Sequence, residues 1–137
     1  MLPKWHILFG AIFSALFYLI FKISIFNSIL IFLSSVFIDI DHYAWYVNKK
    51  KDFSLKNAYI FLKLFKKPKP IMMLFHTIEF LLIVFLLSFF WKGFLFILIG
   101  MLFHSLLDII EMSYENELHF REFFLLSYLL SDKSNYY

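Results

Sequence analysis

His104 and Asp108 are ionisable residues inside a long apolar run of this 137-residue chain. In an α-helix, residues four apart share one face, so the imidazole and the carboxylate can approach a single point. An ionisable side chain inside a membrane span costs roughly 2.5 to 3.5 kcal/mol on insertion scales, and such residues mark functional sites by default. A polar pair bonded to a neighbouring helix is the simpler alternative. Similar residues occur in the other long apolar runs, which favours a functional cluster.

Asp39, Asp41 and His42 fall within four positions at the end of the second apolar run. Two carboxylates this close repel each other unless a cation lies between them. Asp39 and His42 share a helical face, whereas Asp41 is either a ligand presented by an unwinding helix end or a partner that orients a histidine. A hydrated helix terminus is the simpler reading of this stretch.

Two further apolar runs carry groups of the same kind. His6 lies in the first turns of the first run, and His76 and Glu79 share a face near the start of the third. The predicted metal ligands are therefore four imidazoles and up to four carboxylates: His6, Asp39, Asp41, His42, His76, Glu79, His104 and Asp108.

The chain has no cysteine, so a metal ion must be held by imidazole nitrogen and carboxylate oxygen. Zinc is the predicted cofactor, with manganese or iron as alternatives, and either one ion or two ions fit the number of ligands. Two metals bridged by a carboxylate would suit hydrolysis of phosphoesters. Glu79 or Asp41, whichever is not a ligand, is the predicted general base.

The composition predicts an integral membrane protein that positions these groups. Hydrophobic residues make up 62% of the chain and charged residues 17%, against about 25% charged in soluble domains. We expect an all-α polytopic protein, a single membrane domain over residues 1–137, with four spanning helices at about 5–21, 25–47, 71–91 and 94–110. In an up-down-up-down bundle, all the candidate ligands reach the same membrane face.

The segment 48–70 is a basic loop with eight lysines and one acid, Asp52. The positive-inside rule places it in the cytoplasm, and with it both termini and the metal site, at the cytoplasmic or inner membrane. Within it, Phe53 to Phe65 is too short to span and is predicted to lie in the interface, where lysines attract anionic headgroups. A plain topology signal is the simpler reading. No recognition motif indicates that the chain binds nucleic acid. Residues 117–131 are predicted to form a second interfacial segment. The sequence does not indicate an oligomeric state.

The order of the motifs resembles that of the LexA-regulated, YdjM-like family of inner-membrane metal-dependent hydrolases. The resemblance covers nearly the whole chain and rests on His6, Asp39-Ile40-Asp41-His42, His76-Thr77 and His104-Ser105-Leu106-Leu107-Asp108. It implies a multi-helix membrane protein with metal-dependent hydrolase activity. Ile38 and Ile71 stand where that family has proline and a histidine, and Glu79 could replace that histidine. The late His-x-x-x-Asp is also similar to the zinc motif of phospholipase C and the P1-type nucleases.

These observations favour a hydrolase that acts on a phospholipid or another membrane-associated phosphoester at the cytoplasmic face. A metal-ion or proton-coupled transporter is the leading alternative, because intramembrane histidines and aspartates can themselves form an ion pathway. The clustering of polar groups at one face, with the outer halves of the helices nearly uncharged, is evidence against transport. A structural membrane protein with a non-catalytic metal site is the third reading.

Overall fold

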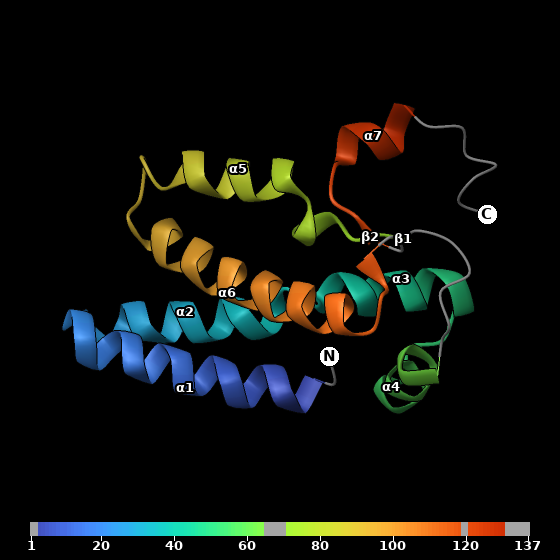
Figure 1. Ribbon diagram of the computed structural model, residues 1–137, viewed down its shortest axis with the longest axis horizontal. Coiled ribbons are helices and arrows are strands. Elements are labelled where there is room, and N and C mark those ends of the chain that lie inside the picture. The colour runs from blue at the N-terminus through green and yellow to red at the C-terminus, as the bar shows by residue number, and fades with distance from the viewer. Residues whose placement is uncertain (1–2, 65–70, 119–120, 131–137) are drawn as a thin grey trace.

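The computed structural model describes residues 3–64, 71–118 and 121–130, and helices dominate it (Figure 1). The helices are α1 (Pro3–Phe21), α2 (Ile25–Phe37), α3 (Ile40–Lys50), α4 (Leu55–Leu64), the 3₁₀ helix η1 (Leu74–His76), α5 (Ile78–Leu87), α6 (Gly93–Tyr114) and α7 (Leu125–Leu130). Two short strands, β1 (Ile71–Met72) and β2 (Arg121–Glu122), pair in parallel. The all-α prediction is confirmed.

Three helical stretches are long and apolar enough to cross a membrane: Lys4–Phe21, Ile25–Lys50 and Gly93–Tyr114. Large apolar side chains cover their outer surfaces; Leu16, Ile20 and Leu102, for example, are each about half exposed or more. A helix satisfies its own backbone polar groups and can present such a surface to lipid. These features are those of a membrane protein.

The second of these stretches differs from the continuous helix expected over residues 25–47. It breaks at Ile38 and Asp39, where Asp39 has a ψ of 2°, and the helix resumes as α3. On a regular helix, residues two apart point to nearly opposite sides. The break changes this relation, so that both Asp39 and Asp41 reach histidines of the same cluster.

The third predicted span, residues 71–91, is only partly helical. α5 has ten residues, about 15 Å of helix, and a bilayer core is about 30 Å thick. The four-span bundle is therefore not confirmed. Residues before α5 form β1 and η1 instead, and Thr77 caps α5 by accepting a hydrogen bond from the Phe80 N–H. Backbone N–H groups of this irregular segment form hydrogen bonds with distant parts of the chain: Phe75 N–H donates to Asp41, and Ile78 N–H donates to the Phe123 carbonyl.

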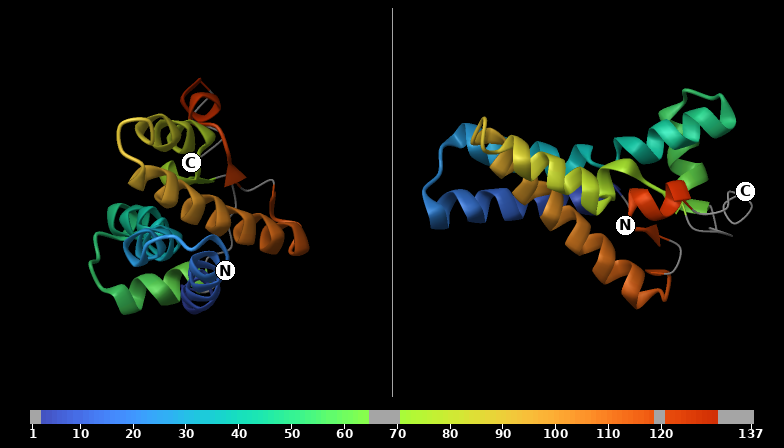
Figure 2. Two further views of the ribbon diagram at one scale, coloured as in Figure 1. Left: turned by 90° about the vertical axis from the view of Figure 1, so that its left-hand side faces the viewer. Right: turned by 90° about the horizontal axis from the view of Figure 1, so that it is seen from above.

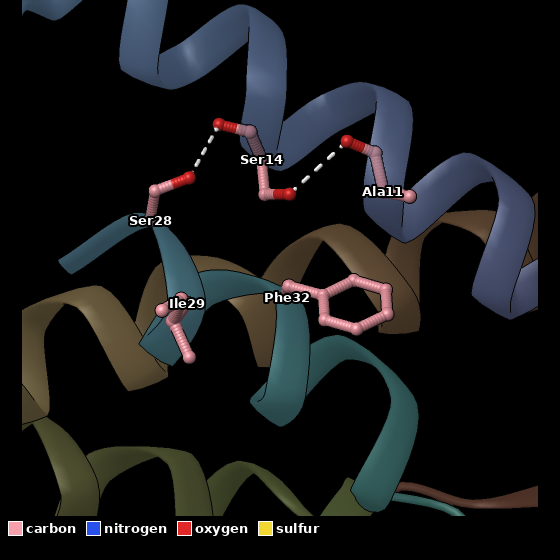
Figure 3. Close-up of a pocket in the computed structure, with 5 residues that line it drawn as sticks. All are labelled: Ala11, Ser14, Ser28, Ile29 and Phe32. Carbon is pink, nitrogen blue, oxygen red and sulfur yellow. Dashed lines mark hydrogen bonds between the residues drawn. The ribbon is translucent and has the colours of Figure 1, made fainter. Parts of the chain in front are cut away.

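α2 packs between α1 and α6 (Figures 1 and 2). The close approach needs two glycines: a Cβ at Gly100 would overlap the Ile31 carbonyl, and a Cβ at Gly10 would overlap the Ser35 hydroxyl. Farther along α1, Ser28 Oγ donates to the Ser14 carbonyl over 3.0 Å beside a small pocket (Figure 3). No residue lining that pocket is ionisable, so it is separate from the candidate site.

α3, α4, β1 and β2 lie toward one end of the molecule, and the α1–α2 and α5–α6 turns lie at the other (Figures 1 and 2). α4 falls within the segment predicted to be interfacial, while Lys66, Lys67 and Lys69 of the basic loop lie outside the described residues. In the predicted interfacial segment 117–131, the helix α7 has six residues.

Candidate metal centre

Four side chains from three parts of the chain converge where the break between α2 and α3, η1 and α6 meet. One ligand atom from each of Asp39, His76, His104 and Asp108 lies within 4.8 Å of the other three. His104 Nε2 is 3.3 Å from Asp39 Oδ1 and 3.4 Å from Asp108 Oδ2, and His76 Nε2 is 3.7 and 3.6 Å from the same two oxygens. Tetrahedral ligands bonded at about 2.0 to 2.1 Å are about 3.3 to 3.4 Å apart. The spacing fits a metal ion.

Both Nε2 atoms are buried and make no hydrogen bond within the described residues. His76 is 3% and His104 0% exposed, so water does not replace the missing partners at the surface. An unsatisfied buried polar atom costs about 1 to 3 kcal/mol. A cation between the two imidazoles and the two carboxylates would satisfy both nitrogens, and this cluster could therefore bind a metal ion.

The backbone of α2 sets the tautomer of His104. His104 Nδ1 lies 2.7 Å from the Ser35 carbonyl oxygen, which can only accept, so Nδ1 carries the proton and Nε2 presents its lone pair to the cluster. Because α2 ends at Phe37, the Ser35 carbonyl is among the last four of that helix, which have no intrahelical donor. The helix break thus supplies the acceptor that orients the ligand.

Asp41 orients a second ligand in a similar way. Its Oδ2 lies 3.2 Å from His76 Nδ1 and accepts the Phe75 N–H at 3.1 Å, which leaves His76 Nε2 to face the cluster. Its Oδ1 lies 2.9 Å from Nδ1 of His42. Burial lowers the pKa of His76, which favours the neutral form that a metal requires. Asp41 is therefore the partner of two histidines.

His6 lies at the edge of the four-atom group. Its Nε2 is 3.4 Å from Asp108 Oδ1 and 3.9 Å from Asp39 Oδ2, and its ring stacks on His104 with centroids 4.1 Å apart. Its Nδ1 is buried without a hydrogen-bond partner among the described residues. His6 thus adds an imidazole from α1 that faces the same two carboxylates, those of Asp39 and Asp108.

Glu79 lies outside the cluster to which sequence reasoning assigned it. Its two carboxylate oxygens accept the backbone N–H groups of Leu125 and Leu126 at 2.9 and 3.1 Å. Since the first N–H groups of a helix have no intrahelical acceptor, this carboxylate caps α7. The structure gives it a role in holding the C-terminal segment to α5, in place of the predicted ligand or base.

Sequence reasoning missed two features of the site. Arg121 Nη1 lies 3.2 Å from Asp108 Oδ2, and its only signal is that it is the single arginine of the chain. Gly10 and Gly100 each lie four residues from a site histidine, His6 and His104, and permit the helix contacts that bring those histidines together. Small residues that allow close helix approach are a recognised signal in membrane proteins.

Comparisons with protein-family models, with curated proteins and with solved structures found no match to this chain. The geometry of the described residues is therefore what identifies the cluster as a candidate metal centre.

Proposed function

We propose that this protein is a membrane-embedded, metal-dependent hydrolase of phosphoesters. One observation carries the proposal: two buried imidazole nitrogens without hydrogen-bond partners in the described chain face two carboxylate oxygens at ligand-to-ligand spacing. The order of the motifs, which resembles that of the YdjM-like hydrolases, supports the same reaction class.

Zinc is the proposed ion, with manganese or iron as alternatives, because two imidazoles and two carboxylates without thiolate suit these metals. Asp39, His76, His104 and Asp108 would hold it, with His6 next to them. A divalent metal bound here would supply a Lewis acid for a phosphoryl oxygen and lower the pKa of a bound water. Asp41, His42 and His76 form a second close group, but there both imidazoles turn Nδ1 toward Asp41, so we assign this group to orientation and proton transfer rather than to a second ion.

His42 is the proposed general base. It is the most exposed histidine of the site, with 26% of its side chain accessible. Its Nδ1 faces Asp41 Oδ1 at 2.9 Å, so Nε2 is free to accept a proton from an attacking water. Asp41 fits this role less well, because its oxygens already face two histidines and the Phe75 N–H.

We propose that the substrate reaches the site from a membrane surface. Asp39 and His42 are each about a quarter exposed, and they lie at the start of α3, the helix that leads to α4. α4 exposes Leu55 and Ile60 beside Lys56 and Lys63. Such a helix suits an interface with anionic lipid headgroups, and the excess of lysine favours the cytoplasmic side.

The test combines three measurements on one detergent-purified preparation: metal content, release of phosphate or headgroup from mixed-lipid vesicles, and metal uptake into sealed vesicles. We expect bound metal and release in the wild type. His42→Gln should keep the metal and reduce release by about 10² to 10⁴, the usual contribution of a general base.

Tyr43→Phe is the matched control, since the Tyr43 hydroxyl donates to the Phe53 carbonyl and does not contact the cluster. It should keep both metal and release. His104→Ala should lose metal and release together. Metal uptake without release would replace this proposal by transport, and bound metal without either activity would favour a structural metal site.

A further inference from the structure

Arg121 is a nearly buried cation beside the metal centre. It belongs to β2, whose pairing with β1 places Arg121 opposite Ile71, five residues before His76. Only 8% of its side chain is exposed, and Nη1 donates to Asp108 Oδ2 over 3.2 Å. The oxygen that accepts this hydrogen bond also faces His76 and His104.

The guanidinium is only partly engaged by the protein. Nη1 also lies 3.7 Å from Met112 Sδ, and Cζ lies 5.5 Å from the ring centroid of Phe123. Nε and Nη2 make no hydrogen bond within residues 3–64, 71–118 and 121–130, and neither is among the sealed, unsatisfied atoms of that region. Donors therefore remain available beside the centre.

The choice of arginine is informative in this chain. Thirteen residues are lysine or arginine, and Arg121 is the single arginine. A lysine would neutralise Asp108 equally well as a point charge, whereas a guanidinium also offers a planar fork of N–H donors that matches phosphate oxygens. The exception to the lysine preference occurs at the position that contacts a candidate metal ligand.

The net charge of the centre also favours binding of a phosphoryl anion beside Arg121. Asp39, Asp41 and Asp108 carry three negative charges, and a divalent metal with Arg121 would carry three positive charges. Without Arg121, a phosphoryl anion would approach a centre with one negative charge in excess. With it, the anion meets a neutral centre that presents two adjacent cations.

We propose that Arg121 binds a non-bridging phosphoryl oxygen of the substrate beside the metal, while its Nη1 stays on Asp108. The inference rests on the proposed phosphoester hydrolase. The phosphoryl group would come from a lipid headgroup or from a soluble phosphate compound, and the chemistry of recognition is the same for both.

The test measures binding to the metal-loaded, detergent-purified protein. The probes are inorganic phosphate and a short-chain phosphatidic acid, and the variants are Arg121→Gln and Arg121→Lys. Lys92→Gln, at the far end of α6, is the matched loss of one positive charge. Metal content is measured in each sample before phosphate is added.

We expect the affinity for both probes to fall about 10- to 100-fold in Arg121→Gln and less in Arg121→Lys, as for loss of a charge-assisted hydrogen bond. Lys92→Gln should match the wild type. A loss confined to phosphatidic acid would assign the headgroup as the source, and a loss confined to inorganic phosphate would assign a soluble compound.

Two results overturn different claims. A wild type that retains no metal overturns the proposed function, and the phosphoryl site falls with it. A metal-loaded wild type whose affinity for both probes matches that of both Arg121 variants within twofold overturns this inference alone. If Arg121→Gln loses its metal, the phosphate affinity of Arg121→Lys at full metal content tests the inference instead. Weaker phosphate binding than in the wild type supports the site. Unchanged binding leaves Arg121 as a positioning residue for Asp108.

Discussion

Replacing Gly100 with alanine tests whether close packing of α6 on α2 creates the metal centre. The added Cβ would overlap the Ile31 carbonyl oxygen and lie 3.1 Å from the carbonyl carbon, where ordinary contacts begin at 3.4 Å. Because the obstacle is backbone, relief requires the helices to separate by on the order of 1 Å, given carbon contact distances of about 3.5 to 4.0 Å. Overpacking of this kind costs about 1 to 3 kcal/mol of stability.

The same displacement acts on the hydrogen bond from His104 Nδ1 to the Ser35 carbonyl, one helical turn away. This bond is now 2.7 Å long, and a shift of about 1 Å takes it past the usual limit of about 3.2 Å. Loss of an orienting partner typically weakens metal binding by about 10- to 100-fold. Metal affinity of Gly100→Ala, measured by competition with a chelator, should fall by that amount.

Gly93→Ala provides the control within the same helix. The three atoms nearest to its Cβ would all belong to the Trp91 ring, a side chain that can rotate away, and Gly93 lies at the opposite end of α6 from Asp108. We expect near wild-type metal affinity. Close packing of α6 on α2 does not create the centre if Gly100→Ala binds metal as the wild type does, or if Gly93→Ala loses as much affinity.

Three further predictions concern the ligands, the topology and the loop. Elemental analysis should find a divalent transition metal in the wild type and little in His76→Ala, since that change removes an unsatisfied buried ligand. Equal metal content in both would show that His76 is not a ligand. A membrane-impermeant thiol reagent added to intact cells should label Lys92→Cys and spare Lys56→Cys, because the basic segment is predicted to be cytoplasmic. The labelling is specific, since the chain has no native cysteine. The reverse pattern would show that the topology is inverted. Hydrogen bonds from Tyr46, Asn57 and Ser54 hold the pKa of Asp52 below its usual range. Its carboxylate should therefore stabilise the α3–α4 connection above about pH 3.9 and lose this effect as the pH falls through its folded pKa, which carboxyl NMR titration can follow; a carboxyl that titrates in the usual range would contradict it.

The residues of the centre could be predicted because ionisable groups are costly in apolar helices and therefore conspicuous. His6, Asp39, His76, His104 and Asp108 all come from this signal, and the structure brings them together. That they lie close together was expected from counting residues between helix ends, which put all of them near one membrane face.

The irregular backbone around the centre could not be predicted in the same way. Hydropathy does not distinguish a 21-residue helix from a strand, a 3₁₀ turn and a ten-residue helix, because all of them can be built from apolar residues. The irregular start of α5 depends on partners that are distant in sequence, since Phe75 N–H donates to Asp41 and Ile78 N–H donates to the Phe123 carbonyl. Arg121 was missed because it follows an acidic stretch, outside every apolar run long enough to span a membrane.

The acceptor that orients His104 is a main-chain carbonyl, and this affects which substitutions position 35 tolerates in evolution. Any amino acid at position 35 supplies the same oxygen, so mutation of that codon does not delete the partner, provided that the new side chain is small enough to lie against Gly10. Distant homologues could thus preserve the imidazole tautomer without preserving residue identity at this position. Covariation should then link positions 10 and 35 through side-chain volume, while position 35 and His104 vary independently.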